Sequence, residues 1–281
     1  MRNRGYTFIE RAPEDARGLT VLDYYAARHP HFGREAWREV LAAGRVTVDG
    51  AVAAGDDLVL PGRTLAYARP PWDEPDPPER LSVLLLDDDL LALDKPAGIP
   101  VTPGAGIQDG SLLHLARERI DARAAPVHRI DRGTSGVVLF ARNPAAARAL
   151  AAAFREHRVE KRYLALVQGT GLPDAFEADR PIRGRPCLTS FEVLRRDADL
   201  GRTLVVAMPA TGRAHQIRIH LASSGAPLVG EPLYEAGGAQ RPGADRGACG
   251  FRLHAWRLRL PHPRTGSPVE VAATPPDDLL P

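Results

Sequence analysis

The sequence predicts an α+β protein with many strands, divided into a small N-terminal module and a larger C-terminal domain. Short apolar or alternating runs, typical of strands, outnumber the segments with helical periodicity, and the two kinds are mixed along the chain. Five prolines within residues 69–79 exclude a helix or a central strand there, so this stretch is interpreted as a semi-rigid linker. A chain of 281 residues is long enough for two ordinary domains.

The composition excludes several classes of protein. No apolar run reaches about 18 residues, so no membrane span is predicted. The first residues lead into no apolar signal segment, and we expect the protein to remain in the cytoplasm. Cys187 and Cys249 stand far apart and cannot form a disulfide framework or a Cys-x-x-Cys metal pattern. The net charge is only +2, but residues 117–162 carry an excess of basic groups that can attract a polyanion.

The small module is predicted over residues 1–69 and the linker over residues 70–80. A first helical segment begins near residue 19. Residues 34–44 place three apolar side chains on one helical face and end on a glycine, which is a natural stop signal. Residues 46–50 alternate apolar and polar side chains up to an Asp-Gly pair, which predicts a β-hairpin.

The larger domain is predicted over residues 81–274. Strands are expected at residues 82–86, 90–94, 136–141, 160–167, 187–194, 203–208 and from residue 253 onward. Helices are expected at residues 111–121 and 144–157, the second opened by Asn143 as the N-cap and a proline at the first helical position. The tail of residues 275–281, rich in proline and acidic residues, is expected to be loose.

The most informative stretch is residues 128–136, His-Arg-Ile-Asp-Arg-Gly-Thr-Ser-Gly. The carboxylate of Asp131 stands between Arg129 and Arg132, whose guanidinium groups favour its ionised form. A glycine-bounded turn beside a buried strand is a rigid support for a reacting group. An isolated Arg-x-Asp-Arg would indicate a charged hairpin loop, but the complete nonamer makes Asp131 the candidate catalytic residue.

This nonamer closely resembles the catalytic motif of the Rlu-type (ribosomal large subunit type) RNA pseudouridine synthases. In that family, His-Arg-Leu-Asp-Arg is followed, one variable position later, by Thr-Ser-Gly. The resemblance implies that Asp131 is the essential catalytic residue. It also implies that Arg129 fills the space that a flipped base vacates, a role that suits a flat cation able to stack. His128 and Arg132 are implied to bind the substrate.

Further segments match motifs of the same family in the family's order. They are Lys-Pro-Ala-Gly at residues 95–98, Lys-Arg-Tyr-Leu-Ala-Leu-Val at 161–167, Thr-Gly-Arg-Ala-His-Gln-Ile-Arg-Ile-His at 211–220, and the C-terminal strand from residue 253. The family's Gly-Asp-x-x-Tyr-Gly is matched only approximately at residues 230–235, where Glu231 replaces the aspartate. The resemblance covers residues 82–272 and implies a mixed, mainly antiparallel sheet with flanking helices and a central cleft.

The same resemblance assigns roles to four more residues. Tyr163 is implied to contact the target base, and Arg218 to form a buried ion pair with the catalytic aspartate. Lys95 and Ile217 are implied to lie against the substrate. The N-terminal order of helix, helix and Gly-Arg-Val-x-Val-x-Gly resembles the small RNA-binding module named after a ribosomal small-subunit protein, with a plain structural subdomain as the alternative.

The implied activity is the isomerisation of uridine to pseudouridine in structured RNA. This reaction breaks the N1–C1′ bond and joins C5 to the same sugar carbon without oxidation or group transfer, so no cofactor is expected. It requires an ionised carboxylate and a base pulled from its stack. The family's commonest substrate is 23S ribosomal RNA, with transfer RNA the alternative. Neither DNA nor a membrane is an expected partner, and a monomer is expected.

Other interpretations fit the residues less well. A serine hydrolase needs glycine two places after its nucleophile, where Val137 stands. A glycosidase needs a second carboxylate, which no motif marks. No metal is expected, because His215 and His220 have poor same-face spacing on a helix and opposite faces on a strand. An RNA-binding protein without turnover remains the alternative from another class, although all three implied catalytic residues are present.

Overall fold

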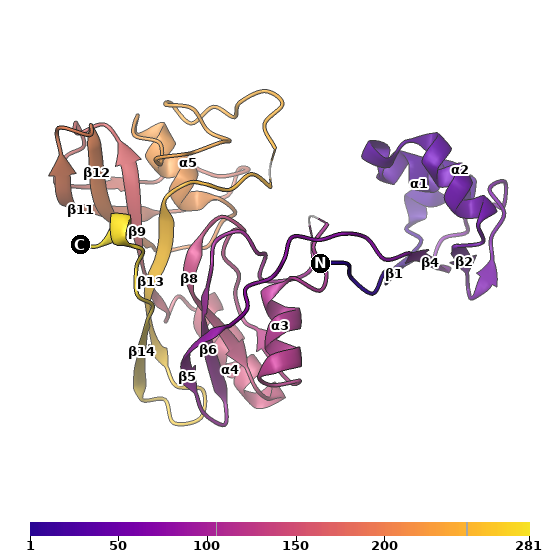
Figure 1. Ribbon diagram of the computed structural model, residues 1–281, viewed down its shortest axis with the longest axis horizontal. Coiled ribbons are helices and arrows are strands. Elements are labelled where there is room, and N and C mark those ends of the chain that lie inside the picture. The colour runs from indigo at the N-terminus through magenta and orange to yellow at the C-terminus, as the bar shows by residue number, and fades with distance from the viewer. Residues whose placement is uncertain (105, 246) are drawn as a thin grey trace. The chain divides into compact units, whose positions relative to one another are not determined.

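The computed structural model describes residues 1–104, 106–245 and 247–281 and divides the chain into two compact units, Met1–Glu74 and Pro75–Pro281 (Figure 1). The division falls inside the proline-rich stretch of residues 70–80. Among the described residues, no helix combines the length and the apolar character needed to cross a membrane.

The first unit is a four-stranded antiparallel sheet with two helices packed on it. Its elements are β1 (Tyr6–Arg11), α1 (Val21–Arg28), α2 (Arg34–Ala42), β2 (Val46–Val48), β3 (Ala51–Val52) and β4 (Thr64–Arg69), and the strand order is β1-β4-β2-β3. The expected helix over residues 34–44 and the β2–β3 hairpin are both present. Trp37 of α2 is buried and stacks on Tyr25 of α1, with 4.5 Å between ring centroids. Strand β1 was not expected, because most of its side chains are exposed and give no alternating pattern.

The second unit is built on a ten-stranded sheet. Its elements are β5 (Ser82–Leu86), β6 (Leu90–Lys95), α3 (Leu112–Arg119), β7 (Ala125–Pro126), β8 (Ser135–Ala141), α4 (Pro144–Arg155), β9 (Glu160–Gln168), β10 (Ala175–Ala178), β11 (Thr189–Asp197), β12 (Arg202–Pro209), α5 (Gln216–Ser223), β13 (Leu253–Pro261) and β14 (Pro268–Ala272). The main path runs β10-β11-β12-β9-β13-β8-β6-β5, with β14 on β13 and β7 on β8. The described pairings are antiparallel apart from β8 with β13, so the mixed, mainly antiparallel sheet is confirmed.

The parallel pair β8–β13 joins the two halves of this sheet and depends on one glycine. Gly136 of β8 has a φ of 107°, and a Cβ atom there would lie 2.2 Å from the carbonyl oxygen of Ala255 in β13. Any other residue would push the strands apart. This close crossing brings the turn before β8 next to strand β9, which pairs with the other side of β13.

Helices cover both faces of β6 and β8, which explains why these strands have nearly continuous apolar sequences. Leu91 and Phe140 face the core that includes α3, whereas Leu90 and Leu139 face the core that includes α4. Figure 1 shows α3 and α4 at this end of the sheet and α5 at the end formed by β9, β11 and β12. The expected N-cap of α4 is confirmed, because the Asn143 side chain accepts a hydrogen bond of 2.8 Å from the backbone N–H of Ala146.

The tail of residues 275–281, expected to be loose, is packed against the sheet. It forms a short 3₁₀ helix, Asp277–Leu279, in which Leu279 is 1% exposed and lies in a core cluster with Leu164 and Leu204. Asp278 also pairs with Arg252, with 2.5 Å between carboxylate and guanidinium atoms. The expectation was wrong because one buried leucine anchors a segment that composition alone marks as mobile.

Candidate active site

Three motifs that are far apart in the sequence meet at one pocket of about 820 Å³ in the second unit. Asp131 comes from the turn between β7 and β8, Tyr163 from β9 and Arg218 from α5. The volume lies within the roughly 300–1,000 Å³ range of ligand-binding pockets. Three more residues predicted from the sequence line the same pocket: His128, Arg129 and Ile217.

Two cationic or hydrogen-bonding side chains face the carboxylate of Asp131. The Nη1 atom of Arg218 lies 3.5 Å from Oδ2, and the Nε2 atom of His215 lies 3.8 Å from Oδ1. The Asp131 side chain is 26% exposed, whereas that of Arg218 is 2% exposed. The acid therefore sits at the floor of an open pocket with a buried positive charge behind it.

The principal partner of Arg218 is Glu231 rather than Asp131. The Nε and Nη2 atoms of Arg218 donate hydrogen bonds of 2.9 and 2.6 Å to the two carboxylate oxygens of Glu231, and the Glu231 side chain is 1% exposed. Glu231 also accepts a 2.9 Å hydrogen bond from the backbone N–H of Leu233. Burial opposes the charge of Arg218, but the hydrogen bonds and charge of Glu231, with the charge of Asp131, outweigh it and raise the pKa of Arg218 above its ordinary value.

An aromatic ring holds the other side of Arg218. Its guanidinium carbon lies 4.0 Å from the ring centroid of Phe251, a cation–π distance. The same ring packs against Gly133, where a Cβ atom would come within 2.6 Å of it. Gly133, at the variable position of the catalytic motif, thus leaves the space that Phe251 needs to reach Arg218.

His215 connects Asp131 to a second tyrosine. It precedes α5 with a left-handed φ of 57°, and its Nδ1 atom lies 2.8 Å from the hydroxyl of Tyr234. Burial lowers the pKa of His215, and the nearby carboxylate of Asp131 opposes this effect only in part. The imidazole is therefore neutral at neutral pH. It can present an N–H group to Asp131 when its Nδ1 atom accepts the Tyr234 proton.

His128 supports the pocket wall as a neutral imidazole. Its Nε2 atom accepts a 2.9 Å hydrogen bond from the backbone N–H of Leu139, and its ring stacks on Phe154 with 5.0 Å between centroids. Burial, followed by the charge of Lys161, lowers the pKa of His128 to about 4. One nitrogen thus holds strand β8, while the residue still lines the pocket.

Lys95 and Arg132 are not among the residues that line the pocket. The buried ammonium of Lys95 donates hydrogen bonds of 2.8 to 3.1 Å to the carbonyl oxygens of Pro96, Ile99 and Arg132. The Nε atom of Arg132 donates a 2.7 Å bond to the carbonyl of Gly98. Both residues tie the Lys-Pro-Ala-Gly turn to the backbone that carries Asp131, and their expected contact with substrate stays a prediction.

Tyr163 lies in the pocket with its hydroxyl protonated. Burial, and secondarily the charge of Asp131, raises the pKa of Tyr163 well above its usual range. The residues around it in β9 behave as the alternating pattern predicted: Ala165 and Val167 share its face and a core cluster, whereas Leu164 and Leu166 belong to the opposite one. The phenol ring therefore offers an apolar, neutral surface beside the acid.

Sequence reasoning missed four residues of this site. Glu231, His215, Tyr234 and Phe251 were not assigned roles there, although the first three lie in segments that were compared with family motifs. One available signal was the acid in the approximate Gly-Asp-x-x-Tyr-Gly match. A buried arginine facing a partly exposed aspartate needs a second counter-charge, and that acid provides it.

Outside the pocket, Ser135 does not have the surroundings of a serine nucleophile. Its hydroxyl lies 2.9 Å from Nδ1 of His254, but the other imidazole nitrogen faces the carbonyl of Ala273 at 3.4 Å, and the histidine is 1% exposed. Neither residue lines the pocket.

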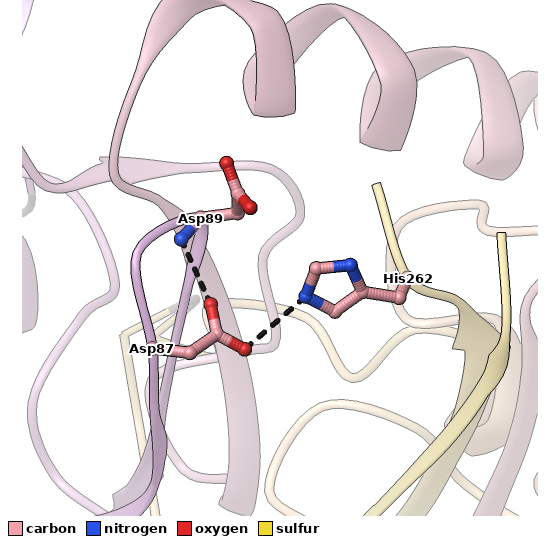
Figure 2. A group of neighbouring side chains, drawn as sticks. All are labelled: Asp87, Asp89 and His262. Atoms are coloured by element: carbon pink, nitrogen blue, oxygen red, sulfur yellow. Dashed lines mark hydrogen bonds and ion pairs between the residues drawn. The ribbon is translucent and has the colours of Figure 1, made fainter. Parts of the chain in front are cut away.

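Three potential metal ligands, Asp87, Asp89 and His262, also lie close together (Figure 2). The carboxylate of Asp89 already accepts bonds of 2.5 and 2.9 Å from Arg264 and of 2.8 Å from Asn143. The hydrogen bond from Arg264 is the main reason that the pKa of Asp89 falls to about 2. Asp87 in turn accepts a backbone N–H from Asp89 and pairs with His262 at 3.2 Å. Arg264 binds Asp89 and His262 binds Asp87, so this cluster anchors the β5–β6 turn to the β13–β14 turn.

Comparison with known proteins agrees with this pocket. A model of the RNA pseudouridylate synthase family matches residues 89–223, which include Asp131, Tyr163 and Arg218. An uncharacterised RNA pseudouridine synthase of Synechocystis is 35% identical over 283 residues, covering 92% of this chain and 95% of the relative. The ribosomal large subunit pseudouridine synthase D of Xanthomonas campestris is 34% identical, with 95% and 88% covered.

Similarity extends to plants and to a solved structure. RNA pseudouridine synthase 5 of Oryza sativa is 32% identical, covering 99% of this chain and 88% of the relative. The structure of human RNA pseudouridylate synthase domain containing 1 superposes with a TM-score of 0.58 at 28% identity, covering 74% of this chain and 88% of that one. The fold and these relatives together define an α+β enzyme that acts on RNA. The chain belongs to the RNA pseudouridine synthase family, whose enzymes are isomerases that convert uridine to pseudouridine.

Proposed function

We propose that this enzyme modifies uridine in large-subunit ribosomal RNA, with Asp131 as its catalytic residue. Two similar proteins, from Xanthomonas campestris and Vibrio vulnificus, are named ribosomal large subunit pseudouridine synthases. The observation that carries the catalytic assignment is the position of Asp131, a partly exposed carboxylate at the floor of a pocket with the buried cation Arg218 3.5 Å away. The chemistry requires a carboxylate at this place, and the guanidinium orients it.

The reaction breaks the N1–C1′ bond, turns the uracil, joins C5 to C1′ and releases the C5 proton. In our proposal, the Asp131 carboxylate acts at the sugar during bond cleavage. Arg218 orients this carboxylate, while Glu231 holds the guanidinium in place through two hydrogen bonds. The Nε2 atom of His215 lies 3.8 Å from the second carboxylate oxygen, beyond hydrogen-bond distance, and in our proposal it donates there once substrate is bound. Hydrogen bonds that are long without substrate can shorten once substrate fills the pocket.

Access to the bond requires the uridine to leave its stack. We propose that the flipped uracil packs on Tyr163, while the exposed Arg129 at the pocket rim fills the vacated space in the RNA. The raised pKa of Tyr163 supports a packing role over proton removal, because the phenol keeps its proton at neutral pH. Arg155 and Arg213, which also line the pocket, add positive charge for the RNA backbone.

We further propose that the first unit binds a part of the RNA other than the reacting uridine. Support comes from the order of α1, α2 and the β2–β3 hairpin, which resembles a small RNA-binding module. Strand β1 adds the rings of Tyr6 and Phe8, 43% and 44% exposed, which lie on one face of the strand with 4.8 Å between their centroids. Exposed aromatic rings provide surfaces on which RNA bases can stack.

The first test is tritium release from C5-labelled uridine in ribosomal and transfer RNA pools taken from cells that lack the gene. Wild-type protein should release tritium from the ribosomal pool, and Asp131→Asn should release none while binding RNA within about tenfold of wild type, because phosphate contacts are untouched. Residual turnover by Asp131→Asn would refute the catalytic assignment. Release confined to the transfer RNA pool would refute the choice of substrate.

A further inference from the structure

A second cavity of about 370 Å³ adjoins the active-site pocket. The two cavities share four lining residues: His157, Lys161, Pro209 and Thr211. Lys161 lies two residues before Tyr163 in β9, so the second cavity begins where the proposed base-binding surface ends. This position makes it an extension of the active site along the path of a bound chain.

The cavity exists because β9 extends further than its pairing with β12. The ladder between these strands ends at the pair Tyr163–Ala207, whereas β9 continues back to Glu160 while paired with β13 on its other side. Strand β12 turns away at this point and ends on Pro209, which pairs with β11 and has no N–H group to offer. The gap between residues 160–162 and residues 208–211 is the cavity.

The lining has the chemistry of a nucleotide site. Val159, Met208 and Pro209 give it apolar walls, and the charged groups are Lys161 and Arg162 with Glu160 as the single acid. Two hydrogen bonds fix the edge that faces the active site: Lys161 Nζ donates to the carbonyl of Thr211 at 2.8 Å, and His157 Nδ1 contacts the carbonyl of Ala210 at 2.8 Å. Apolar walls beside a cation suit a base and a phosphate together.

The ammonium of Lys161 is placed between the two cavities and can bind an anion there. Among the described residues, the carbonyl oxygen of Thr211 is the one hydrogen-bond acceptor recorded for this ammonium. Two of its three N–H groups therefore remain for a ligand. Burial lowers the pKa of Lys161 to about 8, so the group is mostly charged at neutral pH yet incompletely compensated. A phosphate oxygen would supply the missing counter-charge.

In RNA, one phosphate connects each nucleotide to the next. The nucleotide adjacent to a uridine in the first cavity must therefore lie close to that cavity. We propose that the second cavity receives the nucleotide adjacent to the target uridine, with the connecting phosphate at the Lys161 ammonium. This assignment rests on the proposed function of the first cavity. The second cavity would then be a binding site for the nucleotide beside the uridine, separate from the catalytic group.

The test combines a protein change with a matched RNA change. The probe is a synthetic RNA copied from the large-subunit ribosomal RNA segment that the protein protects from nuclease, with a single uridine whose 5′ or 3′ phosphate is replaced by an uncharged methylphosphonate. Wild type should bind one of these RNAs roughly tenfold to a hundredfold more weakly than the unmodified RNA, which is the range for losing a charged hydrogen bond. Lys161→Met should bind all three RNAs equally weakly, because the contact is already lost.

A second pair of variants fills the cavity without touching the lysine. Ala210→Trp places a large ring at an exposed lining position, and Ala198→Trp is the control at an exposed position in the β11–β12 turn. We expect Ala210→Trp to raise KM at least tenfold with little change in kcat, and Ala198→Trp to behave as wild type.

The proposal is overturned if neither methylphosphonate shows coupling to Lys161, or if Ala210→Trp leaves KM unchanged. Binding measured by fluorescence anisotropy needs no turnover. Absence of tritium release from wild type would therefore count against the proposed function alone, while the coupling would still be measured.

Discussion

Replacing Glu231 by glutamine should destabilise the second unit far more than removing the charge of Asp131. Arg218 and Glu231 are 2% and 1% exposed and share two hydrogen bonds of 2.9 and 2.6 Å. Breaking one partner of a buried ion pair costs about 3–5 kcal/mol. Asp131 remains as a second counter-charge 3.5 Å from the guanidinium, so we expect a loss near the lower end, about 3 kcal/mol.

Two matched variants make this prediction sharp. Asp131→Asn removes a single contact from a side chain that is 26% exposed, and exposed pairs are worth at most about 1 kcal/mol. Glu231→Asp keeps the charge with a shorter side chain and should lose less than Glu231→Gln. Urea unfolding followed by far-ultraviolet circular dichroism at pH 7 gives the free energies of unfolding, provided that the slopes agree. If Asp131→Asn loses as much stability as Glu231→Gln, then Arg218 depends on Asp131 for its counter-charge and our account of the Arg218–Glu231 pair is wrong.

Two further perturbations test the walls of the pocket. The pKa of His128 is about 4 in the folded protein, against an ordinary value of about 6.5. As the pH falls below 6.5, the imidazole therefore binds a proton in the unfolded chain but stays neutral in the folded protein, which lowers the free energy of unfolding. Between pH 7 and pH 5 this should remove about 2 kcal/mol of stability, which His128→Gln should not lose; equal losses in the two proteins, measured by urea unfolding, would contradict a buried neutral imidazole. Gly133→Ala should lower stability by about 1–3 kcal/mol and reduce turnover, because its methyl group would sit 2.6 Å from the Phe251 ring and displace it from Arg218. Gly171→Ala, which meets nothing within 4 Å, is the control, and a Gly133→Ala protein matching it in melting temperature and kcat would show that the ring has room to move.

Elements with strong local signals were predicted well from the sequence. The asparagine cap before α4, the glycine after α2 and the Asp-Gly turn of the β2–β3 hairpin each act within a few residues, so they identify the element whatever the rest of the chain does. Strand β1 was missed because its exposed side chains carry no alternating pattern, and β10 because a run of four residues is too short to show its alternation in the sequence. Only pairing with a neighbouring strand defines them.

The candidate site shows the same contrast between residues that the sequence identifies and contacts that only the fold determines. Motifs identified Asp131, Tyr163 and Arg218, and the structure brings all three to one pocket. They did not identify contacts: Lys95 carries a conspicuous charge, yet its ammonium faces three backbone carbonyls. A motif marks a residue that the local structure requires, and a buried hydrogen-bonding role meets that description as well as a substrate contact does.

The shape of the RNA path was beyond the sequence because it depends on where two strands stop pairing. Whether β12 follows β9 to its first residue is decided by the register of the Tyr163–Ala207 pair and by Pro209, whose own pairing is with β11. The sequences of β9 and β12 do not predict the residue at which their pairing ends. If β12 had followed β9 for three more residues, hydrogen bonds would fill the gap, and Lys161 would lie between paired strands. A sheet that opens beside the tyrosine can instead accept the next nucleotide, so the termination of one ladder gives the active site its second cavity.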